Sequence, residues 1–190
     1  MSWYRVLVAG GSATGTTTLG RSLATLKAVP HADVDDYLWL PTSPAFTHKR
    51  PVEERLALMN AVFVPRDSWV LTGTLRGWGD SVIEKVEAVV FLTLDPLTRM
   101  ERLADREVVR CGDAIEPGGS GEEAYRAFTQ WARAYDDDAL ADSRRARDER
   151  WLAGLSCPVL RLDSAKPVSE LIAEVDRWLG NDVGTNGHRG

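Results

Sequence analysis

The stretch from Val6 to Gly20, "VLVAGGSATGTTTLG", contains the glycines and hydroxyl residues from which proteins build phosphate-binding loops. Gly10, Gly15 and Thr17 fit the pattern G-x-x-x-x-G-K-[ST], in which glycines let backbone N–H groups converge on phosphate oxygens. Thr16 stands where that pattern has a lysine. The stretch therefore predicts either a phosphate site without its usual cation or a glycine-rich turn that binds no ligand.

The backbone of such a loop and the positive end of the following helix dipole can hold phosphate without a lysine. Thr17 supplies a hydroxyl where Mg²⁺ is usually held in this type of loop. The predicted nucleotide-binding residues are Gly10, Gly11, Ser12, Ala13, Thr14, Gly15, Thr16, Thr17 and Thr18.

Two carboxylates, Asp33 and Asp35, follow the β-forming run at His31–Val34. Because they are two residues apart at the end of a strand, they point to the same side, near the edge where open α/β sheets bind ligands. Together with Asp36 they could also form a solvated, helix-capping acidic cluster. The spacing alone leaves both interpretations open.

Short β-branched runs alternate with helical periodicity along the chain, which is typical of βαβ units in a parallel sheet. Asp95 and Pro96 predict a capped helix with a first-turn proline, and Pro167 predicts the start of a last helix that ends at Gly180. We expect one domain over residues 1–180. The predicted strands are Tyr4–Ala9, His31–Val34, Trp69–Thr72, Ala88–Leu94 and Val159–Leu162.

The stretch "RCGDAIEPGGSGEE" is rich in glycine and polar residues. It predicts an excursion from the scaffold, about residues 107–124, that acts as a lid. The last ten residues, 181–190, are expected to be a disordered tail.

Composition excludes several classes of partner. The net charge is −5 and the basic residues are scattered, so we expect no nucleic-acid binding. No apolar run is long enough for a membrane span and no signal peptide is apparent, so we expect a cytoplasmic protein that does not bind membranes. Cys111 and Cys157 lack metal-ligand spacing and are expected to be reduced.

Three strings of the sequence resemble known kinases. "WVLTGTLRGWGD" and "VFLTLDPLTRMERLADRE" are similar to the third-strand and fourth-strand regions of nucleoside monophosphate kinases, and "PHADVDDYLW" is similar to the Asp-x-Asp region of shikimate and gluconate kinases. Over residues 3–180 the chain resembles the adenylate kinase/shikimate kinase group. The resemblance implies the P-loop NTPase fold: a five-stranded parallel sheet with helices on both faces, and a lid.

Two positions depart from that group. Thr16 replaces the loop lysine, and Thr72 stands where the adenylate kinase type has an aspartate at the end of its third strand. The metal must then be anchored elsewhere, and the missing charge must come from other residues. Arginine suits this task because its guanidinium group binds phosphate bidentately.

The resemblance also implies roles for individual residues. Thr17 and Asp33 would hold Mg²⁺, and Asp35 would orient and deprotonate the acceptor hydroxyl. Arg106 matches the lid arginine that lies against the nucleotide, and with Arg110 it is assigned to catalysis. The residues expected to bind the acceptor substrate are Asp33, Asp35, Tyr37, Trp39, Arg76, Trp78 and Arg145.

These inferences predict an ATP- and Mg²⁺-dependent kinase, monomeric or homodimeric, that phosphorylates a nucleoside monophosphate or a hydroxylated metabolite. Two alternatives stay open. A nucleotide-binding regulatory module would have lost turnover with Thr16 and Thr72, and a sulfotransferase would explain the resemblance of "TGTTTL" to its S-G-T-T turn.

Overall fold

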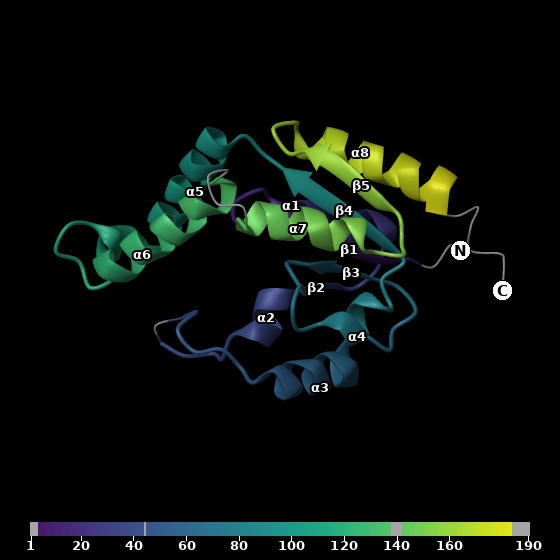
Figure 1. Ribbon diagram of the computed structural model, residues 1–190, viewed down its shortest axis with the longest axis horizontal. Helices are drawn as coiled ribbons and strands as arrows, with labels where there is room; N and C mark the ends of the chain where they lie inside the picture. Colours follow the sequence, from purple (N-terminus) through teal and green to yellow (C-terminus); the bar gives the residue numbers. More distant parts are fainter. Residues whose placement is uncertain (1–3, 44, 138–141, 184–190) are drawn as a thin grey trace.

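The computed structural model describes residues 4–43, 45–137 and 142–183. Its centre is a five-stranded parallel sheet in the order β2-β3-β1-β4-β5 (Figure 1). Each predicted strand is confirmed, with ends that differ by no more than one residue. The strands are β1 (Arg5–Gly10), β2 (His31–Asp33), β3 (Trp69–Thr72), β4 (Ala88–Thr93) and β5 (Val159–Asp163).

Helices cover both faces of the sheet, as the sequence predicts. Side chains alternate along the central strand β1, so that Leu7 packs on one face and Val6 and Val8 on the other. The helices are α1 (Thr16–Lys27), α2 (Val34–Leu38), α3 (Val52–Val62), α4 (Asp80–Ile83), α5 (Pro96–Cys111), α6 (Glu122–Arg133), α7 (Arg144–Ala153) and α8 (Val168–Trp178).

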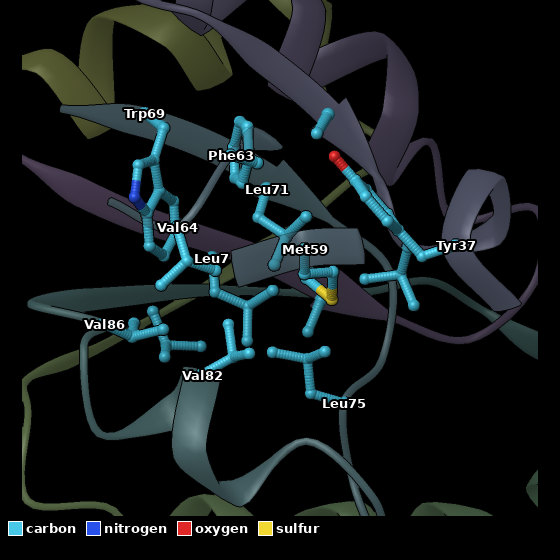
Figure 2. Packing of buried hydrophobic residues seen from close by; sticks show 14 of the residues in the cluster. Leu7, Tyr37, Met59, Phe63, Val64, Trp69, Leu71, Leu75, Val82 and Val86 are labelled. Atoms are coloured by element: carbon cyan, nitrogen blue, oxygen red, sulfur yellow. The ribbon is translucent and has the colours of Figure 1, made fainter. Parts of the chain in front are cut away.

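Each face carries its own apolar cluster. The Leu7 face packs against Met59 of α3, Val82 of α4 and Leu152 of α7, and Figure 2 shows much of this cluster. The opposite face packs against α1 and α8 through Leu23 and Val175. Because β1 is buried on both faces, the loop that follows Gly10 starts from a rigid support.

Local signals set the start of α5. The Asp95 carboxylate accepts a hydrogen bond from the Thr98 backbone N–H at 3.0 Å, and Pro96 occupies the first turn. The helix continues to Cys111, where Gly112 with φ 53° ends it. In Figure 1 its far end projects beyond the sheet together with α6.

The expected polar excursion at about 107–124 is mostly helical. Its first residues belong to α5, a 3₁₀ turn follows at Gly112–Ile115 (η1), and α6 begins at Glu122. The buried face of α5, which carries Arg99, Leu103 and Glu107, extends the helical repeat past the point where the sequence suggested a loop. Lid motion of this segment stays a prediction.

The chain beyond α8 also keeps helical structure for longer than expected. A π-helical turn, η3, spans Leu179–Val183, and the Leu179 carbonyl accepts a hydrogen bond from the Tyr4 hydroxyl at 2.9 Å. The predicted tail therefore begins within a packed turn, and residues 184–190 lie outside the described residues. Among the described helices, none combines the length and apolar character that crossing a bilayer requires.

Candidate active site

The glycine-rich loop lies between the carboxyl end of β1 and the start of α1. Ala13 and Gly15 have φ angles of 68° and 89°, and the Thr14 hydroxyl donates to the Gly11 carbonyl at 2.8 Å. A left-handed alanine costs roughly 1–2 kcal/mol, which is the kind of backbone strain found at functional sites. The loop is therefore held in one specific shape.

No side chain caps α1 within the described structure. The N-cap residue is Gly15, and the first turn, which begins with Thr16, contains no acidic residue. The first N–H groups of the helix thus have no side-chain acceptor, and they lie at the positive end of its dipole. This end of α1 can accept an anion, and half-buried Thr16 adds no charge to it.

The structure brings Thr17 and Asp33 together, as the sequence predicts. The Thr17 hydroxyl donates to Asp33 Oδ2 at 2.8 Å, and the Thr72 hydroxyl donates to the same oxygen at 3.0 Å. The backbone N–H of Asp35 donates to Asp33 Oδ1 at 3.1 Å. Asp33 is opposite Thr72 in the register of β2 and β3, so the strand pairing itself fixes this carboxylate.

These oxygens suit Mg²⁺ bound to a nucleotide. The described residues contain no group of three His, Cys, Asp or Glu side chains that could hold a metal by themselves. Mg²⁺ at nucleotide sites, however, uses one or two protein oxygens in addition to phosphates and waters. The hydroxyl of Thr17 and the carboxylate of Asp33 are such a donor set.

Asp35 lies two residues further along, in the first turn of α2. Its Oδ1 accepts a hydrogen bond from Trp39 Nε1 at 3.2 Å. Partial desolvation by the surrounding protein, followed by the charge of Asp33, raises the pKa of Asp35, whereas Trp39 and Arg110 lower it. A carboxylate with a raised pKa is a stronger base than an ordinary aspartate, which suits the predicted proton-accepting role.

A short hairpin-like segment places aromatic rings beside Asp35. Trp39 pairs with Lys49 in an antiparallel bridge, and the Trp39 and Phe46 rings meet edge to face with centroids 6.0 Å apart. The Arg110 guanidinium lies 4.8 Å from the centre of the Phe46 ring. Trp39 therefore lies beside Asp35 with Phe46 against it, and the role of Trp39 in binding the acceptor stays a prediction.

The two predicted catalytic arginines share one carboxylate, Glu107. Arg106 Nε donates to Glu107 Oε1 at 2.9 Å, and Arg110 Nη1 lies 3.8 Å from the same oxygen. Glu107 is buried, whereas the side chains of Arg106 and Arg110 are 39% and 48% exposed. Of the two, Arg110 is the one whose charge lowers the pKa of Asp35.

Other residues predicted to bind the acceptor are engaged elsewhere. Tyr37 is a core residue with 8% exposure, because the short helix α2 turns Val34 and Tyr37 inward (Figure 2). Its prediction as a pocket wall is corrected accordingly. Trp78 packs against the core with the Arg55 guanidinium 5.1 Å from its ring.

The remaining two predicted acceptor ligands, Arg76 and Arg145, are both placed near α7. Arg76 is ion-paired with Asp148 at 2.7 Å. Arg145 lines a cavity of about 60 Å³ that also involves Thr14 and Tyr135. Neither residue reaches the Asp33 region through a described contact, so their acceptor roles stay predictions.

Sequence reasoning missed Arg99, which ties the glycine-rich loop to the segment after α6. Its guanidinium donates to the Ser12 carbonyl at 3.1 Å and to Asp136 Oδ2 at 2.6 Å, and it is 1% exposed. Arg99 and Glu107 share the buried face of α5 with Leu103, and no local sequence pattern marks either charged residue as buried.

Tyr135 supports the loop from the same side. A Cβ placed on Gly11 would lie 3.0 Å from its ring, and its hydroxyl donates to Asp148 Oδ2 at 2.9 Å. Burial, and then the charge of Asp148, raises the pKa of Tyr135 well above its ordinary value, so the hydroxyl stays protonated. Gly11 therefore admits the tyrosine ring that backs the loop.

A cavity of about 550 Å³ opens at the opposite edge of the sheet, beside Tyr4, Ser68 and Leu179. It lies at the amino ends of β1 and β3. Open α/β sheets bind ligands at the carboxyl ends of their strands, so the candidate site is at the glycine-rich loop.

The arrangement of the sheet, the loop and the helices is the P-loop kinase fold. Shikimate kinase from Acinetobacter baumannii in complex with shikimate superposes with a TM-score of 0.59 at 14% identity, covering 99% of this chain and 97% of that one. A gluconokinase from Sinorhizobium meliloti 1021 gives a TM-score of 0.57 at 18% identity, covering 96% and 94%. A sugar kinase from Janibacter sp. HTCC2649 gives 0.52 at 18%, covering 98% and 100%.

At the level of sequence, no family model matches the chain. The uncharacterized protein YqaC of Bacillus subtilis (strain 168) is 37% identical over 175 residues, which are 92% of this chain and 97% of YqaC. The chain belongs to the YqaC family. The adenylate kinase part of the expected resemblance stays a prediction, since these solved structures are sugar, glucono- and shikimate kinases.

Proposed function

We propose that this chain is a kinase that transfers the γ-phosphoryl group of ATP, with Mg²⁺, to a hydroxyl group of a small acceptor. The observation that carries the proposal is the hydrogen bond between Thr17 Oγ1 and Asp33 Oδ2, 2.8 Å, at the uncapped start of α1. This hydrogen bond places two oxygens that can bind Mg²⁺ at the end of α1 that can bind phosphate. The fold shared with sugar, glucono- and shikimate kinases supports the same function.

Each group at the site has a distinct task. Backbone N–H groups of the Gly10–Thr17 loop bind the phosphates, and Thr17 and Asp33 hold the metal. Bound Mg²⁺ would neutralise the charge on the phosphoryl group that is transferred. Asp35 orients the acceptor hydroxyl and takes its proton, for which its raised pKa suits it.

The charge that a loop lysine would supply must come from arginine. Arg99 donates a hydrogen bond to the loop, but Asp136, Ser12 and Ala132 already accept the hydrogen bonds of its guanidinium. Arg106 is half-buried and Arg110 is exposed, and both lie on α5 where the segment 107–124 begins. We propose that Arg106 and Arg110 contact the phosphates. They would do so when the segment 107–124 closes as a lid, and each arginine would then leave Glu107 and bind the nucleotide.

A hydroxylated metabolite is our first choice of acceptor. The carboxylate of Asp35 suits a hydroxyl nucleophile, and Trp39 fixes that carboxylate through its ring nitrogen. A nucleoside monophosphate is the second candidate, because the exposed Phe46 ring beside Arg110 offers a stacking surface next to a cation. Trp78, Arg76 and Arg145 remain proposed acceptor ligands.

The test is ATP consumption by the purified protein with Mg²⁺ and a panel of acceptors: gluconate, shikimate, free sugars and nucleoside monophosphates. We expect turnover with one class and formation of one phosphorylated product by mass spectrometry, and loss of that turnover in Asp35→Asn. ATP binding without turnover on any acceptor would favour a regulatory module, for which the absent lysine at Thr16 is the supporting observation. Sulfate transfer from a nucleotide phosphosulfate would favour a sulfotransferase.

A further inference from the structure

Thr72, which stands where the adenylate kinase type has an aspartate, makes hydrogen-bonding contacts with three groups of the neighbouring strand. Its side chain is fully buried at the end of β3, and its hydroxyl lies 3.0 Å from Asp33 Oδ2, 3.4 Å from the Ala32 carbonyl and 3.2 Å from His31 Nε2. Strand pairing aligns Asp33 directly with Thr72. One hydroxyl thus joins two side chains of the neighbouring strand.

The single hydroxyl proton of Thr72 determines which of these groups accepts its hydrogen bond. A threonine hydroxyl has one proton, and the contact to the charged Asp33 oxygen is both shorter and charge-assisted, so the proton is donated there. The remaining lone pairs of Thr72 then accept from His31 Nε2, which must carry the hydrogen. The hydrogen bonds run from His31 to Thr72 to Asp33, while Thr17 donates to the same Asp33 oxygen.

Helix α1 leaves room for this pair at Gly20. A Cβ on Gly20 would lie 2.1 Å from Thr72 Cγ2 and 3.4 Å from His31 Nε2. Glycine inside a helix costs about 0.8–1.0 kcal/mol relative to alanine, so its presence here has a structural reason. Three elements, α1, β2 and β3, therefore accommodate one hydrogen-bonded chain that ends at Asp33.

We propose that His31 and Thr72 are positioning residues that orient the Asp33 carboxylate toward the metal of a bound nucleotide. This inference rests on the proposed function, because it gives Asp33 the metal. Thr72 holds Oδ2 in place from the strand side, and His31 keeps the Thr72 proton directed at Asp33 and away from the Ala32 carbonyl. Partners of this kind behind a metal ligand typically change metal affinity by about 10–100-fold when removed.

The test compares ATP affinity with Mg²⁺ and with EDTA by isothermal titration calorimetry. Thr72→Val removes the hydroxyl at nearly constant shape, and we expect it to weaken MgATP binding by about tenfold or more while leaving affinity for metal-free ATP unchanged. Thr72→Ser keeps the hydroxyl and should bind like the wild type. His31→Leu should weaken only MgATP, and His31→Gln, which can still donate a hydrogen bond, should restore it.

The outcomes separate this inference from the proposed function. Equal losses with and without Mg²⁺, or wild-type MgATP affinity in both Thr72→Val and His31→Leu, would overturn the positioning roles. If wild-type protein gained no ATP affinity from Mg²⁺, both proposals would fall. Selective loss of MgATP affinity in a protein without turnover would support the positioning roles and refute the kinase. Should Thr72→Val fail to fold, the pair His31→Leu and His31→Gln decides alone.

Discussion

The carboxylate side and the arginine side of the candidate site differ in how firmly their charged groups are held. Asp33 accepts hydrogen bonds from Thr17, Thr72 and the backbone of Asp35, all from elements of the sheet or packed against it. The side chains of Arg106 and Arg110 are only partly buried, and both pair with Glu107 on their own helix. In the kinase that we propose, folding alone therefore positions the metal ligands, whereas the arginines would reach the phosphates only when the nucleotide binds.

The largest effect expected on the carboxylate side concerns Asp35. Removing a general base typically costs about 10²–10⁴-fold in rate, so Asp35→Asn should lower kcat by that range with little change in thermal stability. The base acts when deprotonated, and the pKa of Asp35 is raised. The wild-type rate should therefore fall with decreasing pH at a higher pH than for an ordinary aspartate.

The measurement is kcat against pH for the wild type and Asp35→Asn, with Asp36→Asn as the control from the same helix. Asp36 is exposed, and no described hydrogen bond joins its side chain to the site. Near-wild-type kcat in Asp35→Asn would remove Asp35 from the chemistry.

The second prediction compares two arginines of α5. Arg99 is buried and paired with Asp136, so Arg99→Ala should lower the free energy of unfolding by about 3–5 kcal/mol. Arg106 is only partly buried, and its partner Glu107 also has Arg110 at 3.8 Å, so Arg106→Ala should lower the free energy of unfolding by less than Arg99→Ala does. Chemical denaturation checks both. Similar stability losses in the two variants would contradict the contrast between a fixed and an available arginine.

The third prediction tests the packing behind Asp33. Gly20→Ala should destabilise the protein by about 1–3 kcal/mol, as overpacking does, because the new methyl group meets Thr72 Cγ2. Thr72→Ser removes that methyl group and should relieve the clash in the double variant. If thermal melts showed additive losses, the approach of α1 to Thr72 would not be the reason for the glycine.

Local signals made much of the fold predictable. The run Ala88–Thr93 is apolar enough to predict a strand that is buried on both faces. The cap of α5 is equally local, because Asp95 accepts its hydrogen bond from the nearby Thr98. Asp33 and Thr17 could be brought together because parallel strands end at a common edge. These features depend on neighbours in sequence or on the general geometry of a sheet.

The remaining parts of the site depend on distant partners. Arg99 binds Asp136, which is 37 residues away, and no local pattern announces that pair. Tyr37 was assigned to the pocket because it is close to Asp35 in sequence, but α2 is helical, so the two side chains face opposite ways. Phe46 contacts Arg110 of α5 from the segment that the bridge between Trp39 and Lys49 closes.

In the kinase that we propose, an arginine of α5 supplies the charge that the missing loop lysine would have supplied. The decisive experiment measures the ATP turnover, on one acceptor, of the wild type, Thr16→Lys, Arg106→Ala and the double variant. Removing one such charge-stabilising donor typically costs ~2.7–4 kcal/mol, or about two to three orders of magnitude in rate. Arg126→Ala, at an exposed residue of α6 paired with Glu122, is the control and should leave the rate unchanged.

We predict that Arg106→Ala loses turnover by that factor and that Thr16→Lys raises ATP affinity and restores part of the rate in the double variant. Such non-additive rescue shows that the two positions share one task. Strictly additive effects, or the absence of turnover in every variant, would contradict the account.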